Sequence, residues 1–225
     1  MGLDVGRIKA ICFDVDGTLS DTDDLWVSNF AKRFSFLKYL TRNNEVKTLA
    51  RWLVMVLESP GNLAYELFDR MHLDDEVAGL LNWIAHHNPG RKPKHFWMVP
   101  KGMELLQYCH QRYPLSIVSA RDERSTLAFV RQFEIESMFK IVLTSQSCVY
   151  TKPFPDPILR AAKEKGVSPE NCLMVGDTTV DIRAGKAAGA QTVGVLCGFG
   201  TERELRRAGA DLILENTHEL MQVLN

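Results

Sequence analysis

The 225-residue sequence predicts an α/β fold, a parallel sheet with helices on both faces, into which an all-helical segment is inserted. A short apolar run, residues 8–13, ends at Asp14 and is typical of a buried strand. From Asp21 to about His87, large apolar residues recur at helical spacing without any strand pattern. After Pro100, strand-like and helix-like segments alternate, as expected of repeated β–α units.

The alternation after Pro100 gives the order of the elements. Strands are predicted at residues 115–119, 141–144, 172–175 and 192–196. Helices are predicted at residues 101–112, 123–133, 157–165 and 180–188. The segments 201–207, 212–214 and 217–224 complete the pattern. The first strand is expected to join the same sheet, so the helical segment is an insertion between two parts of one core.

We define the core as residues 1–20 together with 96–225, and the insertion as residues 21–95. Four helices are predicted in the insertion, separated by breaks near Asn43, Pro60 and Asp74. The insertion is therefore expected to form a second, all-helical domain.

Composition and charge argue against several classes of protein. The formal net charge is -1, so no overall field directs the chain to nucleic acid or to an anionic membrane. The apolar run at residues 53–57 is too short to span a bilayer, and the N-terminus lacks a signal-peptide pattern. The five cysteines are widely spaced without a CxxC pair, which predicts neither a disulfide framework nor a zinc site. We expect a soluble, cytoplasmic protein, whose oligomeric state the sequence leaves open.

Polar side chains follow four of the predicted strands. They are Asp14, Asp16, Ser119, Lys152, Asp177 and Asp181. Because ligands of open α/β sheets bind outside the carboxyl ends of the strands, we expect these side chains to meet at one edge. The sequence therefore predicts a cluster of carboxylates with one hydroxyl and one ammonium group.

This cluster is suited to phosphoryl transfer with a bound cation. Neighbouring carboxylates repel one another and raise each other's pKa, a cost that a hard cation such as Mg²⁺ removes. Phosphoryl transfer needs a nucleophile in line, positive charge around the phosphoryl oxygens and a proton donor for the leaving oxygen. A carboxylate can itself accept the phosphoryl group as an aspartyl-phosphate.

Four motifs resemble those of the haloacid dehalogenase superfamily. Residues 14–19, which read DVDGTL, resemble its DxDGTL signature, and Ser119 resembles its second motif. Lys152 in TKP resembles the third motif, and residues 176–181, GDTTVD, resemble the fourth. The order and spacing of the motifs also agree. The resemblance implies a Rossmann-like core, and it implies that the insertion is a helical cap.

The C-terminal part is similar to the phosphoglycolate-phosphatase-like branch of that superfamily. The similarity lies in residues 192–200, TVGVLCGFG, and in residues 210–213, ADLI. It implies a magnesium-dependent phosphatase acting on a small phosphate ester, with a phosphoglycolate-like substrate as one expectation.

The resemblance also implies a role for each site residue. Asp14 would attack phosphorus, and Asp16 would protonate the leaving alcohol and then activate water. The implied phosphate-binding groups are the Gly17 amide, Ser119, the Ala120 amide and Lys152, which would also neutralise Asp14. The implied metal-binding residues are Asp14, Asp16 through its carbonyl, Asp177 and Asp181. Asp181 would act either through a metal-bound water or by orienting Lys152.

Other interpretations remain open at this point. Arg121, two residues after Ser119, could contact substrate or form a surface salt bridge. A phosphosugar mutase of the same superfamily would return the phosphoryl group to the sugar. A non-catalytic binding protein on this fold is disfavoured by the intact set of motifs. A true dehalogenase is disfavoured by Asp16, because that chemistry needs no acid there.

Overall fold

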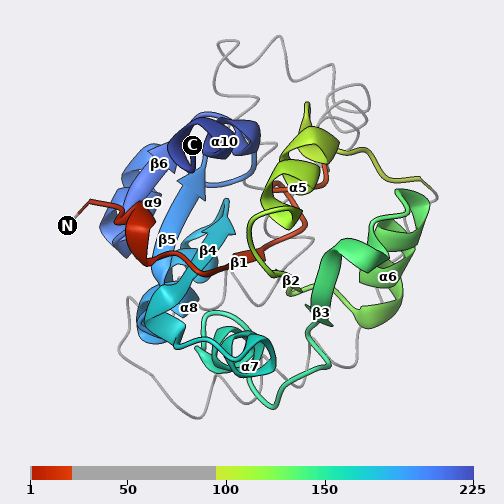
Figure 1. The fold of residues 1–225 in the computed structure, drawn as a ribbon, viewed down its shortest axis with the longest axis horizontal. Coiled ribbons are helices and arrows are strands. Elements are labelled where there is room, and N and C mark those ends of the chain that lie inside the picture. Colours follow the sequence, from red (N-terminus) through yellow and green to blue (C-terminus); the bar gives the residue numbers. More distant parts are fainter. Residues whose placement is uncertain (1, 22–94) are drawn as a thin grey trace, which may run out of the picture. The chain divides into compact units, whose positions relative to one another are not determined.

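The computed structural model describes residues 2–21 and 95–225, which belong to one compact unit of the chain. Within this part, six parallel strands form one sheet in the order β3-β2-β1-β4-β5-β6 (Figure 1). The strands are β1 (Ala10–Phe13), β2 (Leu115–Val118), β3 (Phe139–Leu143), β4 (Cys172–Gly176), β5 (Gln191–Val195) and β6 (Leu212–Leu214). The predicted parallel sheet is confirmed.

The strand order reverses at the centre of the sheet. From β1 the chain builds outward through β2 and β3, and it then crosses back to place β4 on the other side of β1. The carboxyl ends of β1 and β4 therefore lie side by side at a topological switch point, where ligands of such sheets bind.

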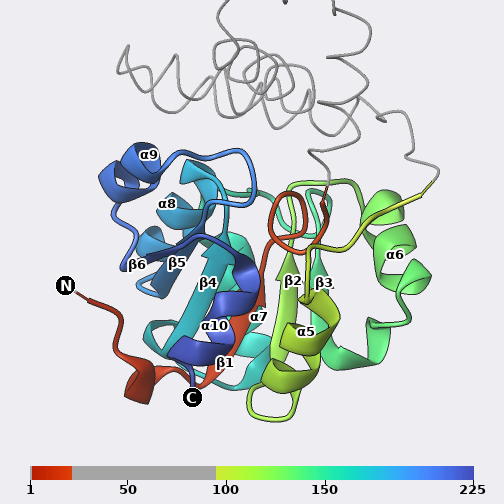
Figure 2. The ribbon, with the colours of Figure 1, turned by 90° about the horizontal axis from the view of Figure 1, so that it is seen from above.

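Helices cover both faces of the sheet. The α-helices are α5 (Gly102–His110), α6 (Glu123–Gln132), α7 (Asp156–Lys165), α8 (Thr179–Ala187), α9 (Glu202–Ala208) and α10 (Leu220–Val223). The 3-10 helices are η1 (Val5–Arg7), η3 (Glu136–Met138), η4 (Pro169–Asn171) and η5 (Thr217–Glu219). Figure 2 shows α5 and α10 together on one face of the sheet, and these two helices contact each other.

Two apolar cores explain why β1 is buried along its whole length. Ile11 and Phe13 face the core that includes residues of α5, α6 and α10. Ala10 and Cys12 face the core that includes residues of α7 and α8. A strand that is covered on both faces reads as a continuous apolar run rather than as an alternating one, and this is how the sequence revealed it.

Several of the predicted element boundaries need correction. The strand predicted at 141–144 is β3, which spans Phe139–Leu143; the prediction started late because the exposed, charged Lys140 interrupts the apolar pattern. The segment predicted at 217–224 divides into η5 and the short helix α10. The strand predicted at 115–119 ends at Val118, which leaves Ser119 just beyond the sheet.

The two ends of the core that flank the insertion run alongside each other. The amide of Asp21 donates to the Trp97 carbonyl at 2.8 Å, and the amide of Val99 donates to the Leu19 carbonyl at 3.0 Å. The helices predicted for the insertion lie outside the described residues, and its bounds at 21–95 stay a prediction. Within residues 2–21 and 95–225, no helix combines the length and the apolar character needed to cross a membrane.

Candidate active site

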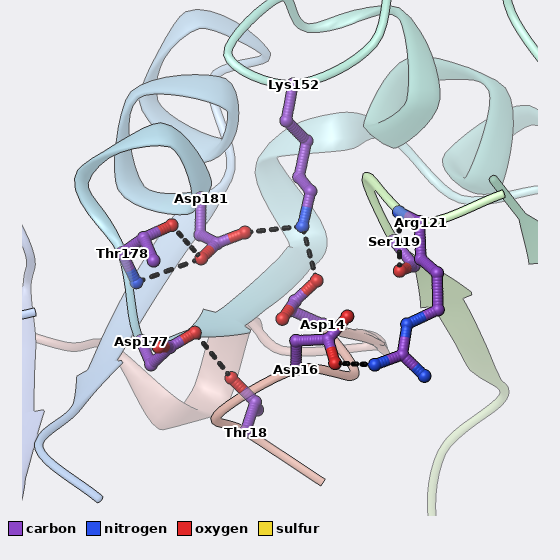
Figure 3. A network of polar contacts seen from close by, with 9 residues as sticks. All are labelled: Asp14, Asp16, Thr18, Ser119, Arg121, Lys152, Asp177, Thr178 and Asp181. Atoms are coloured by element: carbon purple, nitrogen blue, oxygen red, sulfur yellow. Dashed lines mark hydrogen bonds and ion pairs between the residues drawn. The ribbon is translucent and has the colours of Figure 1, made fainter. Parts of the chain in front are cut away.

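The predicted site residues lie together at the carboxyl edge of the sheet (Figure 3). Asp14 directly follows β1, and its amide donates to the Val175 carbonyl of β4 at 2.9 Å. Ser119 follows β2, and Asp177 follows β4. Lys152 reaches the same place from the loop after β3. Four strand ends thus deliver their polar side chains to one edge, as the motif order predicted.

A buried ion-pair network forms the centre of the site. Lys152 Nζ donates to Asp14 Oδ1 at 2.5 Å and to Asp181 Oδ1 at 2.6 Å. The side chains of Lys152 and Asp181 are each 1% exposed, and that of Asp14 is 8% exposed. Removing one partner from such a buried pair typically costs about 3–5 kcal/mol, because a buried charge is left uncompensated. The three side chains therefore fix one another.

The network contains more carboxylates than cations, since Lys152 alone faces Asp14 and Asp181. Burial is the main cause that raises the pKa of Asp14, from 3.8 to about 7; Lys152 opposes the rise, and the carboxylates of Asp181 and Asp16 add to it. Burial acts to lower the pKa of Lys152, but the ion pairs with Asp14 and Asp181 outweigh it and raise that pKa. Lys152 is therefore held in its charged form. Because its single charge does not prevent the rise in the pKa of Asp14, a further cation would stabilise the ionised form of Asp14.

The donor set fits a divalent cation that prefers oxygen ligands. In the part of the chain that the structure describes, carboxylate oxygens of Asp14, Asp177 and Asp181 lie within 4.8 Å of one another, and all three residues are buried. Hard cations such as Mg²⁺ and Ca²⁺ are bound by such oxygens, and Mg²⁺ commonly uses only one or two carboxylates. The residues present therefore fit the predicted metal ion.

Asp181 differs from the other two carboxylates in how its oxygens are used. Oδ1 accepts from Lys152, and Oδ2 accepts from the amide of Thr178 at 3.0 Å and from its hydroxyl at 2.6 Å. Thr178 and Asp181 form a capping box at the start of α8. With both oxygens engaged, Asp181 is placed to orient Lys152, which is one of the two roles left open for it.

A glycine-containing loop packs against Asp177. The amide of Phe199 donates to Asp177 Oδ2 at 2.8 Å, and the amide of Gly200 donates to the Asp177 carbonyl at 3.1 Å. The Thr18 hydroxyl donates to Oδ1 at 3.3 Å. A Cβ atom on Gly198 would lie 2.2 Å from Oδ2, so only glycine fits there. The loop at residues 198–200 therefore fixes the Asp177 carboxylate.

The predicted phosphate-binding groups differ in their own contacts. Ser119 is buried, and its hydroxyl oxygen accepts from the Arg121 amide at 3.1 Å. Ala120 is exposed. The Gly17 amide donates to the Ser20 carbonyl at 2.9 Å, within its own loop. The phosphate-binding role of these groups stays a prediction.

Arg121 forms an ion pair with a residue of the site. Its Nη2 donates to Asp16 Oδ1, and its guanidinium lies over the Phe96 ring, 5.1 Å from the centroid. Of the two roles open to Arg121, the structure shows a salt bridge, but one made to the predicted acid rather than to a surface residue.

Several supporting groups carried no signal in the sequence. The Thr217 hydroxyl donates to the Thr18 carbonyl at 2.7 Å, and the Cys197 thiol donates to the Gly17 carbonyl at 3.4 Å. These contacts fix the loop after Asp14 from the C-terminal part of the chain. No motif marks them, whereas the glycines of the 198–200 loop are the kind of signal that indicates a close backbone approach.

Comparison with known proteins shows similarity over nearly the whole chain. Pyrophosphatase PpaX of Anoxybacillus flavithermus is 30% identical over 220 residues, which cover 97% of each chain. A predicted phosphoglycolate phosphatase from Haemophilus somnus has a similar structure, with a TM-score of 0.62, 21% identity, and coverage of 97% of this chain and 99% of that one. A hydrolase from Pseudomonas syringae has a TM-score of 0.65 and 23% identity, with 96% of this chain and 97% of that one covered.

The family model described as haloacid dehalogenase-like hydrolase matches residues 11–195. The match includes all four motifs, and it confirms both the predicted family and the predicted enzyme class, a hydrolase. This chain therefore belongs to the haloacid dehalogenase-like hydrolases.

Proposed function

We propose that the protein is a magnesium-dependent phosphatase that hydrolyses a small phosphorylated metabolite through an aspartyl-phosphate on Asp14. The observation that carries the proposal is the buried network of Asp14, Lys152 and Asp181 beside Asp177. It combines a carboxylate nucleophile, a fixed ammonium group and oxygen ligands for a cation, which are the parts that phosphoryl transfer requires.

In the first step, Asp14 attacks phosphorus while the bond between phosphorus and the leaving oxygen breaks. Lys152 holds one oxygen of the Asp14 carboxylate, which leaves the other to attack. Asp16 gives its proton to the leaving oxygen, and Ser119 and Lys152 hold the phosphoryl oxygens. Mg²⁺ bound by Asp14, Asp177 and the Asp16 carbonyl would supply positive charge that offsets the charge of the phosphoryl group.

In the second step, water replaces Asp14 on phosphorus. Asp16 takes a proton from the water as it attacks, so that inorganic phosphate leaves and Asp14 is regenerated. Asp181 acts as a positioning residue, because it orients Lys152 and not the reacting atoms. In a mutase, the second step would return the phosphoryl group to a bound sugar.

The relatives support a small, strongly anionic substrate. One is named a pyrophosphatase, and a similar structure is described as a predicted phosphoglycolate phosphatase. Both names refer to a phosphoryl group joined to a second anionic group. We propose a substrate of this kind. We further propose that the insertion at residues 21–95 acts as a cap that selects the substrate, and that the protein is located in the cytoplasm.

A screen of phosphate release from a panel of phosphate esters and pyrophosphate tests the proposal. We expect steady-state release of inorganic phosphate from at least one small substrate in the presence of Mg²⁺. Release from none of them would contradict the phosphatase assignment. Conversion of one sugar phosphate into its isomer without phosphate release would favour the mutase instead.

Removal of divalent cations is expected to abolish hydrolysis. The carboxylates of Asp14, Asp16 and Asp177 repel one another and the substrate when no cation offsets their charge. Activity assayed in excess EDTA should be lost and then restored by Mg²⁺. Ca²⁺ should restore little, because it takes more oxygen ligands and could engage both oxygens of Asp14. Full activity in EDTA would overturn the metal requirement.

Substitution of Gly198 tests the loop that fixes Asp177. The added Cβ in Gly198→Ala would meet Asp177 Oδ2 at 2.2 Å, so the carboxylate must move. We expect Mg²⁺ affinity, measured by calorimetric titration of the free protein, to fall by about 10-fold or more. Gly6→Ala is the matched control, because a Cβ there meets only an ordinary contact at 3.5 Å. Unchanged affinity in Gly198→Ala would contradict the role of the loop.

A further inference from the structure

Arg121 lies between two groups that the proposed mechanism assigns to opposite ends of the scissile bond. Its amide donates to the Ser119 hydroxyl oxygen at 3.1 Å, and its guanidinium donates through Nη2 to Asp16 Oδ1. Ser119 is assigned to the transferred phosphoryl group, and Asp16 is assigned to the leaving oxygen. The guanidinium therefore lies on the side of the site where the leaving part of the substrate must be.

The guanidinium also has hydrogen-bonding capacity that the protein does not use. Nη1 of Arg121 is buried, and within residues 2–21 and 95–225 it has no hydrogen-bond partner. Arginine has five N–H donors in a fixed fork, which suits it to bind carboxylate and phosphate oxygens. Because a buried polar group without a partner is unfavourable, an unused donor in a site needs an explanation, and a ligand oxygen is one.

The position of the guanidinium is fixed from behind. It lies over the ring of Phe96. The Phe96 amide donates to Gln132 Oε1 at 2.9 Å, and Gln132 Nε2 donates to the Phe96 carbonyl at 2.7 Å. The Arg121 side chain is only 13% exposed. The cation is therefore held in place before any substrate binds, which lowers the ordering cost of binding.

We propose that Arg121 determines specificity by binding a second anionic group, a carboxylate or a phosphate, on the leaving part of the substrate. The inference rests on the proposed function and names the residue that recognises the second anionic group of its substrate. Lys152 serves the transferred phosphoryl group, whereas Arg121 serves the anionic group beyond the scissile bond. A substrate with a neutral leaving part leaves Nη1 without a partner, so its kcat/KM is lower than that of an anionic substrate.

A matched pair of substrates tests the assignment. Phosphoglycolate and hydroxyethyl phosphate differ only in a carboxylate that is replaced by a hydroxymethyl group, and pyrophosphate supplies the case of a second phosphate. In Arg121→Met both esters should slow, because Asp16 loses its partner. The ratio of their kcat/KM values should also fall by about 10- to 100-fold, mainly through KM of the anionic ester.

Two further variants separate charge from geometry. Arg121→Lys keeps the charge but not the fork, so it should retain only part of the preference. Arg124→Met is the control, since Arg124 is exposed on α6 and should leave the ratio unchanged. Each anionic substrate is compared with hydroxyethyl phosphate by the ratio of kcat/KM values. If Arg121→Met lowers this ratio for pyrophosphate alone, the second group is a phosphate. If it lowers the ratio for phosphoglycolate alone, the second group is a carboxylate. An equal fall for all substrates in Arg121→Met would overturn the proposal.

Binding of inert analogues tests the inference without turnover. Phosphonopropionate and hydroxypropylphosphonate carry the same two end groups on an uncleavable phosphonate. Calorimetry should show that the wild-type protein prefers the carboxylate analogue by about 10-fold and that Arg121→Met loses this preference. A preference that survives in Arg121→Met would overturn the inference. If the wild-type protein released phosphate from no substrate of the whole panel, the proposed phosphatase function would fail, while the binding preference would still decide the role of Arg121.

Discussion

Replacement of Asp14 by Asn is expected to lower kcat by at least about 10⁴-fold, because the proposed chemistry begins with attack by this carboxylate. An amide is a poor nucleophile, and it carries no charge to hold a cation. The fold should survive the change, since Lys152 keeps its ion pair with Asp181. Phosphate release under substrate saturation and thermal unfolding of the same preparation measure the two effects.

Asp4→Asn is the matched control for this substitution. Asp4 is exposed near the N-terminus, and its hydrogen bonds to Gln191 use only its backbone. The control should therefore keep wild-type activity. An Asp14→Asn variant that retained more than a small fraction of wild-type kcat would show that another group accepts the phosphoryl group.

Much of the candidate site could be predicted because it depends on chain order. Three site residues directly follow a buried strand, namely Asp14, Ser119 and Asp177. Parallel strands bring their carboxyl ends to one edge of the sheet. Lys152 needed the motif around it, because nothing in its own loop distinguishes it from a surface lysine. The apolar runs that predicted β1 and β4 are continuous because both faces of these strands are buried.

Other parts of the site depend on contacts that no local pattern records. The Phe199 amide that holds Asp177 is a backbone donor, so the identity of the residue does not reveal it. The Thr217 hydroxyl reaches the Thr18 carbonyl across 199 positions of sequence. The partner of Arg121 was equally hidden, because an arginine beside a turn pairs with a surface carboxylate as readily as with Asp16. Tertiary packing, and not propensity, decides each of these contacts.

Replacement of Asp16 by Asn is expected to stop the reaction halfway. The variant keeps Asp14, the Lys152 contact and the backbone carbonyl of residue 16, but it loses the proton donor and the later base. Each of these functions is worth on the order of 100-fold or more. A substrate with a good leaving group needs little protonation in the first step, so Asp14 should still be phosphorylated. The second step should then stall, because no base activates water.

The measurement that tests the central claim most directly is mass spectrometry of the Asp16→Asn variant, quenched after mixing with such a substrate and Mg²⁺. The account predicts a phosphoryl adduct on the peptide that contains Asp14, and no adduct when Asp14→Asn is combined with Asp16→Asn. An adduct on Ser119, or normal turnover without any adduct, would contradict the assignment of Asp14 as the nucleophile and Asp16 as the acid and base.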